Sequence, residues 1–163
     1  MKLKLAIILS LFFALSLSGC QTTTSTTLYR GAKADPKGAI TLSAEQPLQH
    51  WQDTYVTIDY SYTRQGNQFN IDGTFAFSDG AKINYQFIRR LKLKLFLLDK
   101  EMRVVEYREV LRVLGYSLED QDEFSAEFTL PENVVAFTFG YEGVLRDDEG
   151  FSNTIWNLPK RNR

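Results

Sequence analysis

The sequence is poor in the residues that most often carry chemistry. It contains one cysteine, Cys20, and one histidine, His50, among 163 residues. A lone cysteine excludes a disulfide framework and a cysteine-rich zinc site, and a lone imidazole leaves few routes to acid–base catalysis or metal binding. The formal net charge is only −1 and the pI about 5.9. These values argue against a nucleic-acid-binding domain, because such domains are clearly basic.

The chain also lacks an apolar run long enough to span a bilayer as a helix, which takes about 20 residues. Its most apolar segment, residues 5–17, has thirteen residues interrupted only by Ser10 and Ser16, and it follows Lys2 and Lys4. Two positive charges before a short apolar run are typical of a secretory signal peptide. We therefore interpret the first residues as a targeting segment that takes no part in the fold.

The apolar run ends in Leu17-Ser18-Gly19-Cys20. Together with the charges before it, this motif resembles the lipobox of bacterial lipoproteins, although the resemblance covers only the first twenty or so residues. It implies that residues 1–19 are removed, that the Cys20 thiol receives a diacylglycerol, and that the new amino group is acylated with a fatty acid such as palmitate. Several acyl chains anchor a protein stably, whereas one does so only marginally.

The residue after the cysteine bears on localisation. In Gram-negative lipoproteins of this class an aspartate there favours retention in the inner membrane, but this chain has Gln21. The resemblance therefore implies an anchor in the outer membrane, on its periplasmic face, or in the outer leaflet of the cell membrane if the source has one membrane. The mature chain would carry 17 basic and 20 acidic residues, a formal charge of −3. That balance alone gives no reason to expect adhesion to anionic lipid.

Residues 20–38 are predicted to be the lipidated cysteine and a flexible tether. Residues 21–27 are entirely polar, and residues 28–38 contain Gly31, Pro36 and Gly38. Such a segment has too little apolar surface to repay the entropy of ordering it. At up to ~3.3 Å per residue it would reach about 60 Å if fully extended. At the other end, residues 159–163 are predicted to be a frayed basic tail.

Residues 39–158 are predicted to form one all-β domain, because apolar residues recur with a period of two. The alternating runs cover residues 56–63, 69–77, 91–97, 124–130 and 135–141, with a further short strand around Ile155. Gly66-Asn67 is a hairpin signal between the first two runs. The predicted core includes six residues on the most apolar faces of these runs: Leu91, Leu93, Leu95, Val135, Phe137 and Phe139.

The fold class follows from this spacing. Strands every 8–12 residues without helical crossovers indicate about seven or eight antiparallel strands. We expect an immunoglobulin-like β-sandwich, with a small lipocalin-type barrel as the alternative. Residues 102–114 fit either a strand or a helix, and their valines favour the strand.

Candidate functional residues outside the anchor are few. His50 has no nucleophile-elbow motif anywhere in the chain to accompany it. The acidic clusters at Glu119–Glu123 and Asp147–Glu149 lack the ligand spacing of a calcium loop. Lys92 and Lys94 fall on the solvent side of an alternating strand, and Trp51 and Trp156 could offer flat rings to a sugar. We therefore assign no catalytic residue, no metal ligand and no cofactor.

The sequence thus predicts a membrane-anchored envelope lipoprotein that acts as a non-enzymatic protein-binding or assembly module. Its predicted partners are the membrane, through the lipid on Cys20, and an envelope protein, with no nucleic acid. The alternative is a carrier of a small ligand or glycan, which would need an interior cavity.

Overall fold

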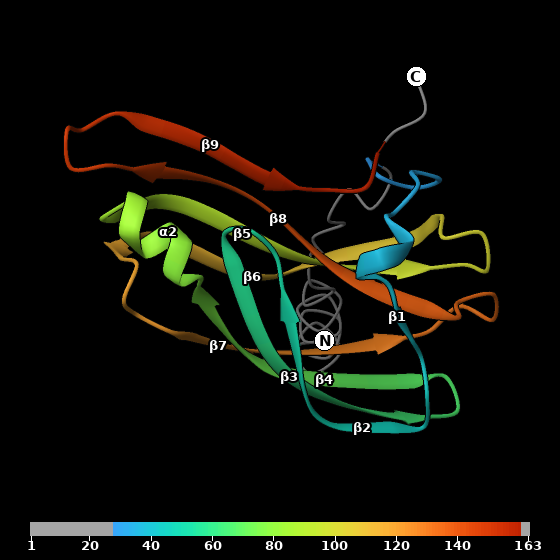
Figure 1. The fold of residues 1–163 in the computed structure, drawn as a ribbon. Coiled ribbons are helices and arrows are strands. Elements are labelled where there is room, and N and C mark those ends of the chain that lie inside the picture. Colours follow the sequence, from blue (N-terminus) through green and yellow to red (C-terminus); the bar gives the residue numbers. More distant parts are fainter. Residues whose placement is uncertain (1–27, 161–163) are drawn as a thin grey trace, which may run out of the picture.

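The computed structural model describes residues 28–160, which form two antiparallel sheets packed face to face (Figure 1). Sheet I has the strand order β2-β3-β4-β7, and sheet II has the order β1-β8-β5-β6 with β9 also paired to β8. The strands are β1 (Ile40–Thr41), β2 (Glu45–Gln52), β3 (Val56–Gln65), β4 (Gln68–Phe77), β5 (Phe87–Leu98), β6 (Val104–Ser117), β7 (Asp122–Thr129), β8 (Ala136–Arg146) and β9 (Ser152–Asn157).

This architecture confirms the predicted all-β antiparallel sandwich. The alternating runs became β3, β4, β5, β7, β8 and β9, and Gly66-Asn67 closes the β3–β4 hairpin between Gln65 and Gln68. Of the ambiguous residues 102–114, those from Val104 onward belong to the strand β6. The barrel alternative is wrong, because within residues 28–160 the strands pair into two separate sheets that do not close on one another.

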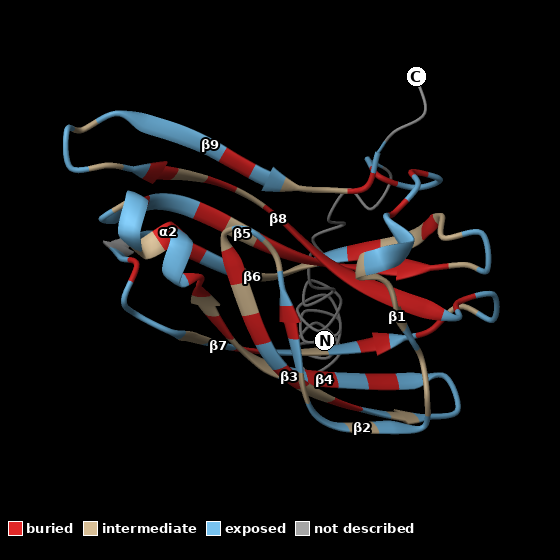
Figure 2. Cartoon of the chain, viewed as in Figure 1, coloured by how far each residue is buried: buried red, intermediate tan, exposed pale blue. Residues whose placement is uncertain are grey.

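The core between the sheets is built from the predicted alternating faces (Figure 2). Of the six residues assigned to it from the sequence, five are buried: Leu91, Leu93, Leu95, Phe137 and Phe139. The assignment of Val135 is wrong, since this residue is 40% exposed. It precedes β8, where its backbone is held by hydrogen bonds to Leu98 and Leu42. Its side chain lies at the rim of the sandwich, beyond the buried inner face.

The prediction of a flexible tether is wrong for residues 28–38. Residues 28–34, here called the strap, cross the outer face of sheet II, where Gly31 and Ala34 donate hydrogen bonds to the carbonyls of Val104 and Met102. The Tyr29 ring packs edge-on against Phe96 and Tyr107. The strap thereby closes a second, smaller apolar cluster. A short 3-10 turn, η2 (Pro36–Gly38), follows it, with Asp35 accepting a hydrogen bond from the Lys37 amide.

The basic tail is also partly structured. Lys160 and Lys33 exchange two backbone hydrogen bonds of 2.8 and 2.9 Å, and Pro159 is buried. The prediction of a frayed tail is therefore wrong for these two positions, and residues 161–163 lie outside the described residues. The predicted signal peptide (1–19), Cys20 and residues 21–27 also lie outside them.

Besides the two-residue strand β1 and the turn η2, two elements were not predicted. The first is β2, an edge strand whose pairing with β3 is interrupted by a bulge between Gln46 and Gln49. The second is the short helix α2 (Asp79–Asn84), which begins after Ser78, whose hydroxyl accepts a hydrogen bond from the Ala81 amide. Ile83 in this helix is exposed to solvent.

Candidate functional site

His50 lies on the surface of sheet I, opposite Asp59 on the neighbouring strand. Its Nδ1 is 2.7 Å from the Asp59 carboxylate, and both side chains are more than half exposed. The hydrogen bond to Asp59 raises the pKa of His50 above its ordinary value, against a small opposing effect of burial. The side chains that shift this pKa are Asp59 and Gln52, and neither carries a hydroxyl or thiol that His50 could activate. The geometry is that of a surface ion pair between strands.

The two acidic clusters stabilise local structure. Glu119 lies 3.4 Å from the ammonium of Lys82 on α2, and Asp147 accepts a hydrogen bond from the Phe151 amide across the β8–β9 turn. Burial raises the pKa of Asp122 above its ordinary value. Within residues 28–160 no three side chains of the metal-ligating types are gathered at one place.

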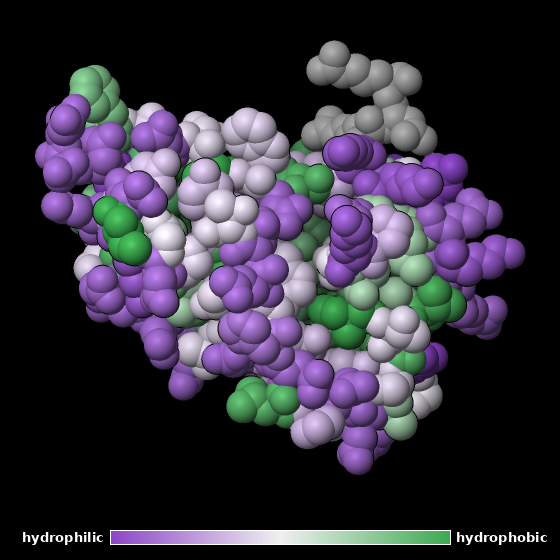
Figure 3. All heavy atoms as spheres, in the orientation of Figure 1, coloured by the Kyte–Doolittle hydropathy of each residue, from purple (hydrophilic) through white to green (hydrophobic). Residues whose placement is uncertain are grey.

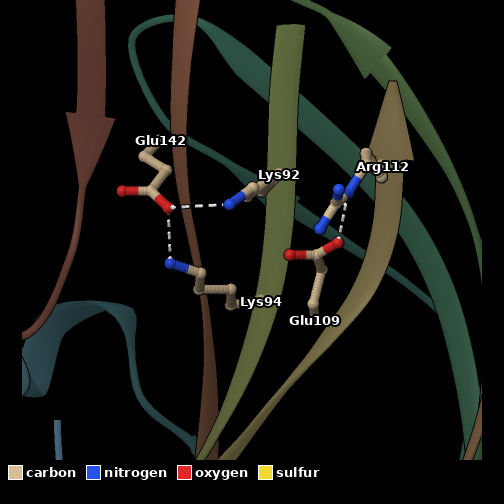
Figure 4. Close-up of polar contacts among 5 residues, drawn as sticks. All are labelled: Lys92, Lys94, Glu109, Arg112 and Glu142. Carbon is tan, nitrogen blue, oxygen red and sulfur yellow. Dashed lines mark hydrogen bonds and ion pairs between the residues drawn. The ribbon is translucent and has the colours of Figure 1, made fainter. Parts of the chain in front are cut away.

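Lys92 and Lys94 lie on the outer face of sheet II, where they share one carboxylate (Figure 4). The Glu142 Oε1 atom is 2.8 Å from the Lys94 ammonium and 3.9 Å from that of Lys92. Lys94 also lies 5.1 Å from the centre of the Tyr29 ring, in the geometry of a cation–π contact. On β6 the guanidinium of Arg112 pairs in the same way with Glu109. Each of these three cations thus has a carboxylate partner within the sheet.

We expect the Glu142 ion pairs to make stability depend on acid pH. The hydrogen bond from Lys94 lowers the pKa of Glu142, helped by the charges of Lys94, Lys92 and Arg90 and opposed by burial. A carboxyl whose pKa is depressed on folding stabilises the fold above its unfolded pKa and loses that contribution as the pH falls through its folded pKa. The difference in unfolding free energy between the native chain and Glu142→Gln should therefore be greatest near neutral pH and shrink below about pH 4.5. Urea titrations across pH 3–7 measure this difference, and a gap that is constant over this range would contradict the assignment.

The two tryptophans differ in accessibility and lie on different sheets. Trp51 on β2 is buried, with its ring edge-on to Phe139 at a centroid distance of 5.7 Å. Trp156 on β9 is 66% exposed and stands opposite Glu142 of β8. Trp156 therefore has the more accessible ring, and the two rings do not form a shared platform.

A cleft of about 650 Å³ lies where the strap and η2 meet the ends of β2, β8 and β9. Asp53 and Asn157 line this cleft. One carboxylate oxygen of Asp53 accepts a 2.7 Å hydrogen bond from the Tyr141 hydroxyl and a 2.9 Å hydrogen bond from the Asn157 side-chain amide. Burial first, and then this carboxylate, raise the pKa of Tyr141, so the phenol stays protonated. The Trp51 indole also lines the cleft, as do Lys33, Lys37 and Lys160.

The sheet edges form the other candidate site, and most of them carry features that block pairing with another chain. The edge strand β2 has Pro47 and a bulge. The edge strand β6 carries four charged residues and β7 three. The Arg108 side chain of β6 also donates a hydrogen bond to the Glu127 carbonyl of β7, which bridges the two sheets at that side.

The edge strand β9 has none of these protections. Its sequence, Ser-Asn-Thr-Ile-Trp-Asn, contains no charge and no proline, and its pairing with β8 runs from Ser152 to Asn157 without a register shift. Among its residues only Ile155 is buried. The β8–β9 hairpin extends past the rest of the sandwich at the end away from the strap (Figure 1). The outer edge of β9 is thus a regular, uncharged strand edge next to an exposed tryptophan.

The chain matches no protein-family model and no curated protein. None of the helices within residues 28–160 is both long and apolar enough to cross a membrane.

Proposed function

We propose that this protein is a lipid-anchored envelope lipoprotein that acts as a non-enzymatic protein-binding or assembly module, with β9 as its docking edge. The anchor is Cys20, on the strength of the Leu17-Ser18-Gly19-Cys20 motif after the charged and apolar segments. The observation that supports the binding role is the contrast between β9 and the long edge strands β2, β6 and β7. A regular strand edge without charge, proline or bulge invites an added strand.

The partner that fits this edge is an extended protein segment that adds to sheet II beside β9. Main-chain hydrogen bonds would provide affinity, and side chains alternating along the added strand would provide specificity. Trp156 supplies an aromatic anchor next to that edge, and exposed tryptophans are frequent hot spots of protein interfaces. The interior of the sandwich is filled by aromatic and aliphatic side chains. This filled interior favours a protein-binding module over the alternative, a carrier with an interior cavity.

Site-specific crosslinking in the native cell tests the docking edge. A photoreactive residue replaces Trp156 on β9 and, as matched controls, Leu48 on β2 and Leu114 on β6, which are 73% and 64% exposed. We expect one adduct of defined mass from position 156 only, which disappears when Thr154→Lys adds a charge to the β9 edge. In addition, Trp156→Ala should weaken the complex by about 30-fold, as for a hot spot worth about 2 kcal/mol. Equal adducts at all three positions, or an adduct that survives Thr154→Lys, would place the partner elsewhere.

A further inference from the structure

The charge of this protein is distributed very unevenly along the chain. Residues 28–38 and 159–163 together contain six basic residues and one acidic residue, a formal charge of +5. Residues 39–158 contain 11 basic and 19 acidic residues, a formal charge of −8. The structure joins the two basic segments through the backbone hydrogen bonds between Lys33 and Lys160. Four described basic residues of these segments, Arg30, Lys33, Lys37 and Lys160, are therefore brought to one end of the molecule, here called the basic end, whereas residues 39–158 are acidic overall.

Three lysines of this basic end, Lys33, Lys37 and Lys160, line the cleft. Within residues 28–160 none of them forms an ion pair, whereas Lys82, Lys92 and Lys94 each pair with a glutamate. The carboxylates at the cleft are engaged by other donors. Asp35 accepts the Lys37 amide, and Asp53 accepts Tyr141 and Asn157. Hydrophilic side chains crowd over the strap on the face shown in Figure 3. Uncompensated ammonium groups around a cleft favour an anionic ligand.

The course of the chain indicates where that anion comes from. Leu28 begins the strap and is eight residues after Cys20, a span of at most about 26 Å. This step rests on the proposed function, because it takes Cys20 as the lipidated residue. An anchor at Cys20 keeps the basic end close to the headgroups. The β8–β9 hairpin leaves from the opposite end of the molecule (Figure 1).

We propose that the basic end, formed by Arg30, Lys33, Lys37 and Lys160, docks on anionic phospholipid headgroups of the bilayer that holds the anchor. Each lysine or arginine close to an anionic surface strengthens binding about fivefold, from roughly 1 kcal/mol each. The attraction acts within about one Debye length, and the anchor adds to it by keeping the basic end at a high local concentration near the headgroups. The acidic body is repelled by the same surface. Docking at the cleft, which the C-terminal residue Asn157 of β9 also lines, therefore directs the β8–β9 turn away from the membrane and leaves the N-terminal part of β9 within reach of a partner (Figure 1).

Vesicle co-sedimentation tests this docking without the anchor. The chain from residue 20 onward, with Cys20→Ser, is mixed with vesicles of phosphatidylcholine alone or with added phosphatidylglycerol. We expect binding only to the anionic vesicles, weakening as salt is raised. The triple variant Lys33→Gln, Lys37→Gln, Lys160→Gln should bind at least about tenfold more weakly.

A charge-matched control removes Arg89, Arg90 and Arg146, which lie at the opposite end of β5 and β8, each replaced by glutamine. This variant should keep its affinity within about twofold, because its lost charges are beyond a Debye length of the docked surface. Equal losses in the two triple variants, or equal binding to neutral vesicles, would overturn the proposal. Displacement by inorganic phosphate at constant ionic strength would also overturn it, since the cleft would then take a soluble anion. Because the probe carries no acyl chain, these outcomes are independent of whether Cys20 is lipidated.

Discussion

Replacing Phe137 by alanine is expected to lower the free energy of unfolding by about 3–5 kcal/mol. Phe137 is fully buried in β8, at the centre of an aromatic cluster that joins the two sheets. Its ring lies 5.4–5.9 Å, centroid to centroid, from four others, those of Tyr60, Tyr62, Phe69 and Phe139. Its truncation leaves a cavity that these rings cannot all close. A domain of this size has a total stability of about 5–15 kcal/mol, so the variant should be close to unfolding.

Urea denaturation of the chain from residue 20 onward, with Cys20→Ser, measures this effect. Phe151→Ala is the matched control, because Phe151 is 65% exposed in the β8–β9 turn and its loss should change stability by less than about 0.5 kcal/mol. An unfolding curve for Phe137→Ala that superimposes on that of the native chain would show that Phe137 does not join the sheets as described.

Phe96→Ala should have a comparably large effect, but on the strap. Phe96 is fully buried on the outer face of sheet II, stacked with Tyr107 and edge-on to Tyr29. Truncation of Phe96 should lower the free energy needed to detach the strap from sheet II by about 3–5 kcal/mol. The strap can open while the sandwich core stays closed, because the two apolar clusters are separate.

Hydrogen exchange resolves this local opening. The amides of Gly31 and Ala34, bonded to the carbonyls of Val104 and Met102, should exchange at least about a hundredfold faster in Phe96→Ala. The amides that link β3 and β4 should change much less, since they lie in the other sheet. Truncation of the exposed Leu114 on β6 is the control and should leave the strap amides unchanged. Unchanged protection of Gly31 and Ala34 in Phe96→Ala would contradict the strap's dependence on this ring.

The sandwich was predictable from the sequence, because a strand that buries only one face alternates apolar and polar residues. In β3 and β4 the large apolar residues are buried in the core, and the residues between them are partly or fully exposed, so period and face coincide. Val135 fits the same period as Phe137, yet a period cannot show where a sheet ends. Val135 lies at the rim of the sandwich, where its side chain is only partly covered.

The strap was not predictable, because its buried residues are Tyr29 and two alanines. Alanine contributes little to an apolar pattern, and the partners of the strap, around Met102 and at Lys160, are far away in sequence. The strand β2 was missed for a similar reason, since only Trp51 among its residues is buried. The basic cleft depends on the backbone hydrogen bonds between Lys33 and Lys160. These residues are far apart in the sequence, so no local sequence pattern could predict their pairing. The strand order is what identifies β9 as an edge strand. Its lack of charge, proline and bulge could therefore not be interpreted from the sequence.

Mass spectrometry of the protein purified from membranes of its native cell tests the central claim, a lipid anchor at Cys20, most directly. We predict that the mature chain begins at Cys20 and that its first residue carries the mass of a diacylglyceryl group on the thiol and of an acyl chain on the amino group. The variant Cys20→Ala should accumulate as the unprocessed chain without these masses. A mature protein that begins elsewhere, or that begins at an unmodified Cys20, would contradict the account.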